Sequence, residues 1–211
     1  MHLKLHSLSC RRGGRLLFER LSAELGPGTM LTVRGPNGSG KSSLLRILAG
    51  FLEPESGQVR WKEKADESWR EEDLEARTAY LGHANGVKSQ LTVAENLQFW
   101  AALAGAMRCD PYAALSVMGL EGLEDMQAGL LSAGQQRRLA LCRLPLTARP
   151  LWLLDEPEAA LDTASRAALA HMISDHLAQG GLTLAASHGV LDVPDSETLT
   201  LRPPPHTEVR A

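Results

Sequence analysis

The sequence lacks long apolar runs, basic excess and any targeting segment. None of its 211 residues belongs to a stretch approaching the roughly 20 apolar residues that span a bilayer, and the first six form no signal-peptide core. The net charge of -3 at pH 7 gives no whole-chain field that would hold nucleic acid. We therefore expect no nucleic-acid partner, and a chain that stays in the cytosol and reaches a membrane only through a partner.

Cysteine is scarce and unpatterned. Cys10, Cys109 and Cys142 are odd in number and show no C-x-x-C spacing, which excludes a disulfide framework and a cysteine zinc site. This usage fits a reducing compartment. The hydrophobic content of 44% and charged content of 22% exclude extensive disorder and fit one globular domain.

A phosphate-binding loop is the most specific feature that is present. Residues 35–42 fit the pattern G-x-x-x-x-G-K-[ST], between an apolar strand at 30–34 and a helix at 43–49. In such a loop the glycines let backbone amides face the phosphates, Lys41 supplies a point charge and Ser42 offers its hydroxyl to Mg²⁺. A chance glycine-rich turn is the alternative, which the flanking strand and helix disfavour. The expected nucleotide contacts are Gly35, Pro36, Asn37, Gly38, Ser39, Gly40, Lys41, Ser42 and Ser43.

Two carboxylates follow an apolar strand farther along the chain. The run 151–154 ends in Asp155, and Glu156 follows at once. With a phosphate loop upstream, Asp155 is expected to hold Mg²⁺ with Ser42, and Glu156 to orient and deprotonate an attacking water. An acidic strand end that merely caps a helix is the alternative. The pair predicts hydrolysis of the nucleotide, with Glu156 and Lys41 as catalytic residues.

The pattern of elements predicts an α/β fold with a mainly parallel core sheet. Strands at 2–8 and 16–25 predict an N-terminal antiparallel region, and core strands are expected at 30–34, 79–82, 151–155 and 182–186. A helical block at 92–131 lies between two core strands, so we expect an inserted helical subdomain. One domain is expected over residues 1–202, with the subdomain at about 84–145 and an extended tail at 203–211.

The segment at 131–135 opens another helix. Ser132 and Gln135 have the spacing of a reciprocal capping box, and the plain interpretation is a well-capped helix. Gly134 leaves backbone bare in the first turn, as a helix end approached by phosphate would require.

With these residues in place, the sequence resembles the ATP-binding subunits of ABC transporters. Their signature L-S-G-G-Q is matched by residues 131–135, with Ala133 in the third position. The resemblance implies ATP and Mg²⁺ as cofactors and a head-to-tail pair of subunits. Each ATP would then lie between the phosphate loop of one copy and Ser132, Gly134 and Gln135 of the other. It also implies that His188 is the catalytic switch histidine and that Asp162 lies in the dimer-contacting D-loop.

Within that superfamily the sequence is most similar to the haem-exporter ATPase subunits of cytochrome c maturation. The likeness is carried by short strings at 35–38 with 43–50, 80–83, 95–97, 131–138 and 150–157. It implies ATP hydrolysis coupled to haem export or haem-chaperone release, by a homodimer bound peripherally to membrane-spanning subunits on the cytoplasmic face of the inner membrane. No direct haem contact is expected. A transporter for another substrate and a soluble ABC-type ATPase of an assembly machine remain alternatives, since such a core does not touch cargo.

The sequence departs from the family pattern in three places. Arg11 and Arg12 stand where most subunits carry an adenine-stacking aromatic ring, and His83 replaces the Q-loop glutamine, as in the haem-exporter subunits. Pro145 predicts that the signature helix ends or kinks just before it. We expect the partner-docking surface at residues 83–104, where Phe99 and Trp100 either receive a coupling helix or lie in the subdomain core.

Overall fold

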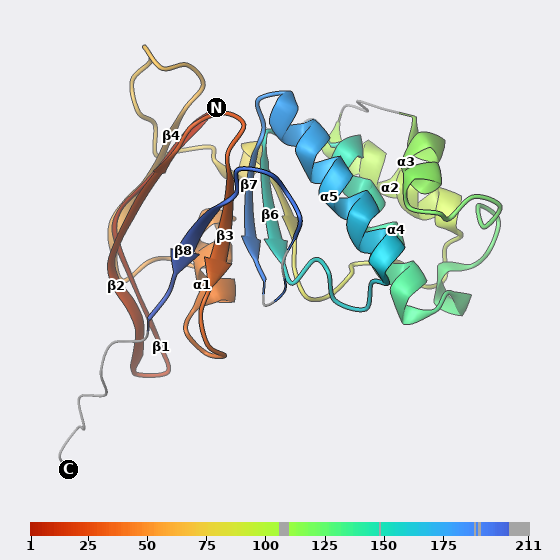
Figure 1. Cartoon of the computed structure of the whole chain (residues 1–211), viewed down its shortest axis with the longest axis horizontal. Helices are drawn as coiled ribbons and strands as arrows, with labels where there is room; N and C mark the ends of the chain where they lie inside the picture. The colour runs from red at the N-terminus through yellow and green to blue at the C-terminus, as the bar shows by residue number, and fades with distance from the viewer. Residues whose placement is uncertain (106–109, 148, 188, 190, 203–211) are drawn as a thin grey trace.

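The computed structural model describes residues 1–105, 110–147, 149–187, 189 and 191–202. Three layers lie side by side in Figure 1: an antiparallel sheet, a parallel sheet and a group of helices. The expected tail at 203–211 lies outside the described residues. Within the described part, no helix combines the length and apolarity that crossing a membrane requires.

The two sheets have different strand directions. The antiparallel sheet has the order β2-β1-β4, and the five-stranded sheet has the order β5-β6-β7-β3-β8 with parallel pairing throughout. The predicted α/β class, parallel core and antiparallel N-terminal region are confirmed. The strands are β1 (His2–Arg12), β2 (Arg15–Leu25), β3 (Met30–Arg34), β4 (Ser56–Lys62), β5 (Thr78–Leu81), β6 (Leu151–Asp155), β7 (Leu182–Ala186) and β8 (Glu197–Thr200).

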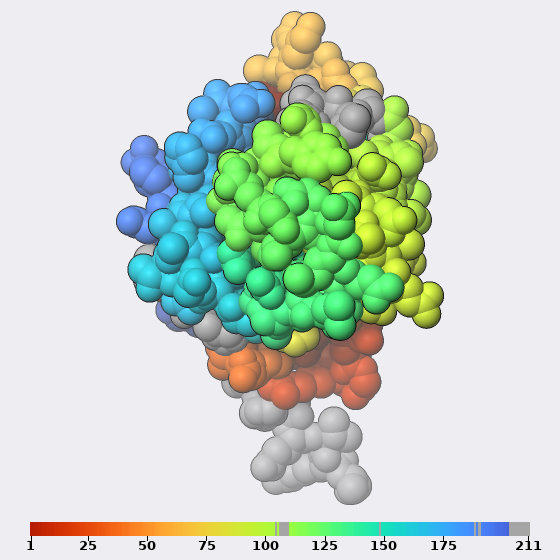
Figure 2. All heavy atoms as spheres, turned by 90° about the vertical axis from the view of Figure 1, so that its right-hand side faces the viewer, coloured from red at the N-terminus to blue at the C-terminus, as the bar shows by residue number. Residues whose placement is uncertain are grey.

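The helices lie mainly on one side of the parallel sheet. Three of them come between β5 and β6, and Figure 2 shows that end of the molecule facing the viewer in yellow-green and green. Capping boxes start α2 at Thr92 and α4 at Ser132, as their sequence spacing predicts. The helices are α1 (Lys41–Leu48), α2 (Val93–Ala104), α3 (Pro111–Val117), α4 (Ala133–Leu146) and α5 (Thr163–Ala178), with single 3₁₀ turns at Glu75–Arg77 and Ala128–Leu130.

The parallel sheet separates two hydrophobic cores. Leu151 and Leu153 of β6 pack with α1 and the antiparallel sheet, whereas Trp152 and Leu154 pack with the helices on the other face. Successive side chains of a strand point to opposite faces, so a strand covered on both sides must be apolar throughout. This explains why β6 is a continuous apolar run that carries its first charge at the end, at Asp155.

The end of α4 differs from the prediction. The helix begins at Ala133 and continues through Pro145 to Leu146, so the expectation that it ends or kinks before the proline is wrong as to where it ends. Pro145 stands in the last turn, where its missing N–H removes one backbone bond and interrupts no further helix.

Candidate nucleotide site

The phosphate loop (residues 35–42) joins β3 to α1 through three glycines with positive φ values. Gly35, Gly38 and Gly40 have φ values of 150°, 75° and 100°. A Cβ on Gly35 would lie 2.6 Å from the carbonyl oxygen of Leu201, and one on Gly40 would lie 2.9 Å from Phe18 Cδ1. Because Gly40 is the N-cap of α1 and has no side chain, the first amides of the helix stay open to an anion.

Polar side chains inside this loop suit a phosphate. Lys41 is 7% exposed, and its Nζ donates to the carbonyl oxygens of Gly35 at 2.9 Å and Pro36 at 3.3 Å. The buried Ser39 hydroxyl has no hydrogen-bond partner among the described residues. A buried hydroxyl without a partner costs free energy, which an incoming phosphate oxygen would recover. The loop therefore fits nucleotide phosphates.

The end of β6 meets the start of α1. Ser42 Oγ donates to Asp155 Oδ1 at 3.0 Å, although 113 residues separate the two in sequence. Asp155 is 4% exposed. The described residues contain no group of three His, Cys, Asp or Glu side chains that could hold a metal alone. Mg²⁺ takes few protein ligands and completes its shell with water and phosphate oxygens, so a hydroxyl and a carboxylate suit it.

Glu156 occupies a sharp bend directly after β6. Its φ is 49°, and its backbone N–H donates to the carbonyl oxygen of Ala186 on β7 at 2.8 Å. A non-glycine residue in the left-handed region costs roughly 1 kcal/mol or more, and such positions gather at functional sites. The bend therefore places Glu156 directly after Asp155, where β6 ends and the buried part of the strand stops.

Arg137 is a site residue that the sequence reasoning missed. Its side chain lies on α4, is 3% exposed and donates five hydrogen bonds. Burial lowers the pKa of the guanidinium, and three nearby carboxylates offset part of that lowering. These bonds attach α4 to the segments after β5 and β6. The acceptors are the carbonyl oxygens of Gly82, Asp155, Glu156 and Pro157 and Oδ1 of Asn85, at 2.8 to 3.3 Å.

A second arginine of α4 reinforces the same attachment. Arg143 donates to the carbonyl oxygens of Tyr80 at 2.8 Å and Asn85 at 3.1 Å. Burial is the main cause that lowers its pKa to about 10, so the group stays charged at pH 7. Its guanidinium lies 5.7 Å from the ring centroid of Trp100, which is 7% exposed. The core alternative therefore holds for Trp100, whereas Phe99 remains 40% exposed.

The predicted signature residues form the start of α4. Gln135 N–H donates to Ser132 Oγ at 3.2 Å, and Ser132 N–H donates to Gln135 Oε1 at 2.9 Å. A Cβ on Gly134 would lie 2.9 Å from the carbonyl oxygen of Ala160, so this glycine is required by packing within the chain as well. Figure 1 shows this end of α4 well apart from the phosphate loop. Within one copy, the signature and the loop are not brought together.

Two other predicted positions lie near the end of β7 and the start of α5. His188 lies outside the described residues. Asp162 is the N-cap of α5 and accepts a hydrogen bond from the Ser165 N–H at 2.8 Å, which lowers the pKa of Asp162. Of the departures from the family pattern, Arg11 is paired with Glu55 at 2.8 Å, while Arg12 and His83 are exposed.

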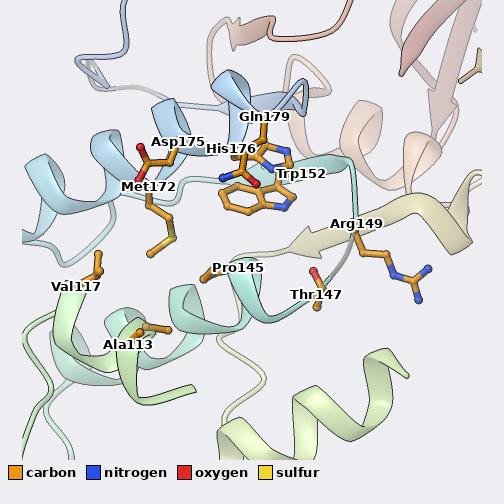
Figure 3. A pocket seen from close by; sticks show the side chains of 11 residues that line it. Ala113, Val117, Pro145, Thr147, Arg149, Trp152, Met172, Asp175, His176 and Gln179 are labelled. Atoms are coloured by element: carbon orange, nitrogen blue, oxygen red, sulfur yellow. The ribbon is translucent and has the colours of Figure 1, made fainter. Parts of the chain in front are cut away.

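A cavity of about 290 Å³ lies away from the phosphate loop (Figure 3). It is enclosed by α3, the end of α4, β6 and α5. Trp152 and His176 both line it, and their rings stack on each other with 3.8 Å between the ring centroids. None of the predicted nucleotide-site residues lines this cavity, so it is separate from the site.

The fold and the loop define a P-loop nucleotide-binding protein. The sequence matches the ABC transporter family over residues 18–159. It is 47% identical to the cytochrome c biogenesis ATP-binding export protein CcmA of Pseudomonas putida, over 91% of each chain. Its identity to CcmA of Rhizobium johnstonii is 44%, over 95% of this chain and 94% of that one. The chain belongs to the ABC transporter family and, within it, to the family of CcmA.

Solved structures support the same fold. An ABC transporter ATP-binding protein from Pyrococcus furiosus superposes with a TM-score of 0.80 at 22% identity, covering 95% of this chain and 98% of that one. An ATP-binding subunit of another ABC transporter gives a TM-score of 0.76 at 24% identity, covering 89% and 80%. The predicted class, an ABC-type ATPase subunit, is confirmed.

Proposed function

We propose that this chain is the ATP-hydrolysing subunit of an ABC transporter that serves c-type cytochrome biogenesis. The observation that best supports ATP hydrolysis is the hydrogen bond from Ser42 to Asp155. This bond joins the phosphate loop to the end of β6, which Glu156 directly follows. The cytochrome role is supported by the relatives, which are cytochrome c biogenesis ATP-binding export proteins. Haem export or haem-chaperone release is the work that we assign to the complex.

In this proposal each residue type has one task. The backbone N–H groups of the loop, which Pro36 lacks, bind the phosphates with Lys41 and Ser43, and Ser42 and Asp155 hold Mg²⁺. Bound Mg²⁺ neutralises charge on the phosphates. Glu156 accepts the proton of the attacking water, and His188 assists at the γ-phosphate. Residues 1–202 form one domain, and its helical part is the subdomain at about 84–145.

The second half of each site comes from another copy of this chain. The exposed Ser132, with Gly134 and Gln135, would face the phosphate loop of that copy in a head-to-tail homodimer. We infer that membrane-spanning subunits dock on the helical end shown in Figure 2. We also infer that the complex lies peripherally at the cytoplasmic face of the inner membrane. Apart from Phe51, the exposed large apolar side chains of the described part all belong to that end: Phe99, Leu103, Tyr112, Val117, Met126 and Leu130.

A pair of variants tests the hydrolytic site. Glu156→Gln should keep ATP binding, lower turnover by about 10²- to 10⁴-fold and accumulate an ATP-bound dimer, because the general base is lost while the phosphate contacts remain. Lys41→Ala should instead weaken ATP binding itself. Turnover, nucleotide affinity and light scattering separate the two effects. Undiminished turnover in Glu156→Gln would remove that residue as the base.

The cargo needs a separate experiment. Deleting the gene should abolish haem-stained c-type cytochromes, and the wild-type chain, but not Glu156→Gln, should restore them. Normal cytochromes after deletion would favour transport of another substrate. Affinity purification from detergent-solubilised membranes should recover integral-membrane subunits, and their consistent absence would favour an ATPase that acts without a transporter.

A further inference from the structure

Glu158 lies two residues after Glu156 and reaches across to the segment that follows β7. Its Oε1 accepts a short hydrogen bond from the Ser187 hydroxyl and a second from the Gly189 N–H at 3.2 Å. These donors stand on either side of position 188. One carboxylate oxygen therefore accepts a hydrogen bond from each of these two residues, Ser187 and Gly189, called here the switch pair.

The residues around the Glu158 carboxylate leave room for it to contact the backbone closely. A Cβ on Gly189 would lie 3.2 Å from Glu158 Oε1, so the glycine lets the backbone approach. Oε2 of Glu158 is buried and has no hydrogen-bond partner in the described part of the chain. Burial lowers the pKa of the Arg137 guanidinium, and the negative charge of Glu158 offsets part of that lowering. A carboxylate withdrawn from water is tolerated beside such a cation.

Backbone hydrogen bonds also order the turn that carries Glu156 and Glu158. The N–H of Ala159 donates to the Glu156 carbonyl at 3.1 Å, and the N–H of Leu161 donates to the Glu158 carbonyl at 3.2 Å. Glu156 is itself tied to β7 through Ala186. Helix capping does not explain Glu158, because Asp162 is the N-cap of α5.

We propose that Glu158 is a positioning residue that fixes the switch pair, Ser187 and Gly189, relative to the bend at Glu156. The inference rests on the proposed ATP hydrolysis, since it assigns the contact a role in the rate of that reaction. Glu158 bonds to neither the phosphate loop nor Ser42 within the described residues. Loss of the contact should therefore lower kcat and leave the KM for ATP almost unchanged.

Two substitutions separate the acceptor from the charge. Glu158→Ala removes the acceptor and should lower kcat about tenfold or more, with KM within about twofold. Glu158→Gln keeps an Oε1 that can accept from both donors, so it should retain kcat within about threefold. Ser187→Ala removes one donor and should fall between them. Glu121→Ala, a change at an exposed glutamate, is the control and should match the wild type.

Hydrogen exchange at the Gly189 amide gives a readout that does not require hydrolysis. Its protection should be lost in Glu158→Ala and kept in Glu158→Gln. Wild-type kcat and exchange in Glu158→Ala, or equal defects in both variants, would overturn the proposal. If Glu158→Ala does not fold, an unchanged kcat in Ser187→Ala has the same effect. A wild-type chain that hydrolyses no ATP would refute the proposed function. The hydrogen exchange of the Gly189 amide would still show whether Glu158 holds this residue.

Discussion

At the scale of single residues, Arg137 and Arg138 differ in how deeply their side chains are buried, although they are neighbours on α4. The Arg137 guanidinium is buried and serves five acceptors, whereas the half-buried Arg138 donates to the carbonyl oxygens of Met118 at 2.8 Å and Gly119 at 3.0 Å. Arg137→Met should lower the free energy of unfolding by about 3 kcal/mol or more, because several buried carbonyls lose their donor. Urea denaturation measures this loss.

Arg138→Met is the matched control, with an expected loss of about 1 kcal/mol, because its acceptors remain nearer to water. Arg137→Lys should stay well below the wild type, since an ammonium cannot reproduce the planar fork of donors. Equal losses in the two methionine variants would contradict the attachment of α4 to the loops after β5 and β6.

Single residues were predictable where their partners are local. The phosphate loop and both capping pairs are encoded within a few positions, and the structure forms the capping pairs as the spacing predicts. Asp155 has a distant partner, Ser42, but the apolar run before it marks it as the end of a buried strand. Arg137 was missed because its acceptors lie 18 to 55 residues away. The available signal was a charge that continues the apolar stripe of Leu141 and Leu144 on α4.

At the scale of elements, α2 and α4 begin with the same device but are assigned different tasks. Thr92→Ala and Ser132→Ala each remove a hydroxyl that accepts from the N3 amide, at 3.1 and 3.2 Å. Each should cost about 1 kcal/mol of stability. Only Ser132→Ala should also lower ATP turnover, because only the start of α4 is proposed to face ATP in the other copy.

Thermal denaturation and ATPase assays on the two variants compare these effects directly. Equal loss of turnover in both would mean that Ser132 acts through the helix cap alone. Normal turnover in Ser132→Ala would remove the residue from the ATP site.

Elements were predictable where burial imposes a pattern. β6 and β7 are covered on both faces, and their apolar runs identified them. β8 was not predicted from the sequence. This edge strand, Glu-Thr-Leu-Thr, is largely exposed, so it has no run of apolar residues. The charge run at residues 62–75 predicts a solvated connection with a short helix, but the structure forms no α-helix there. This polar stretch instead folds back onto β4, where Arg70 pairs with Trp61 and Glu71 with Arg60.

At the scale of the whole molecule, the chain carries both halves of a site but keeps them apart. The phosphate loop, Asp155 and Glu156 lie at the carboxyl ends of β3 and β6, and the signature lies at the start of α4 (Figure 1). In a two-fold dimer the phosphate loop of each copy would face the signature of the other. The dimer would then have two sites, and each ATP would be bound by both copies. Turnover per subunit should then rise with protein concentration.

Mixing two inactive variants tests this arrangement. Lys41→Ala spoils the phosphate loop and keeps the signature, whereas Ser132→Ala does the reverse, so a mixed dimer has one site built from two intact halves. Random pairing at equal concentrations makes half of the dimers mixed, and the mixture should recover about a quarter of wild-type turnover. Adding Lys41→Ala to the double variant Lys41→Ala/Ser132→Ala is the control and should recover nothing. A mixture no more active than the mean of its separate components would show that each copy completes its own site.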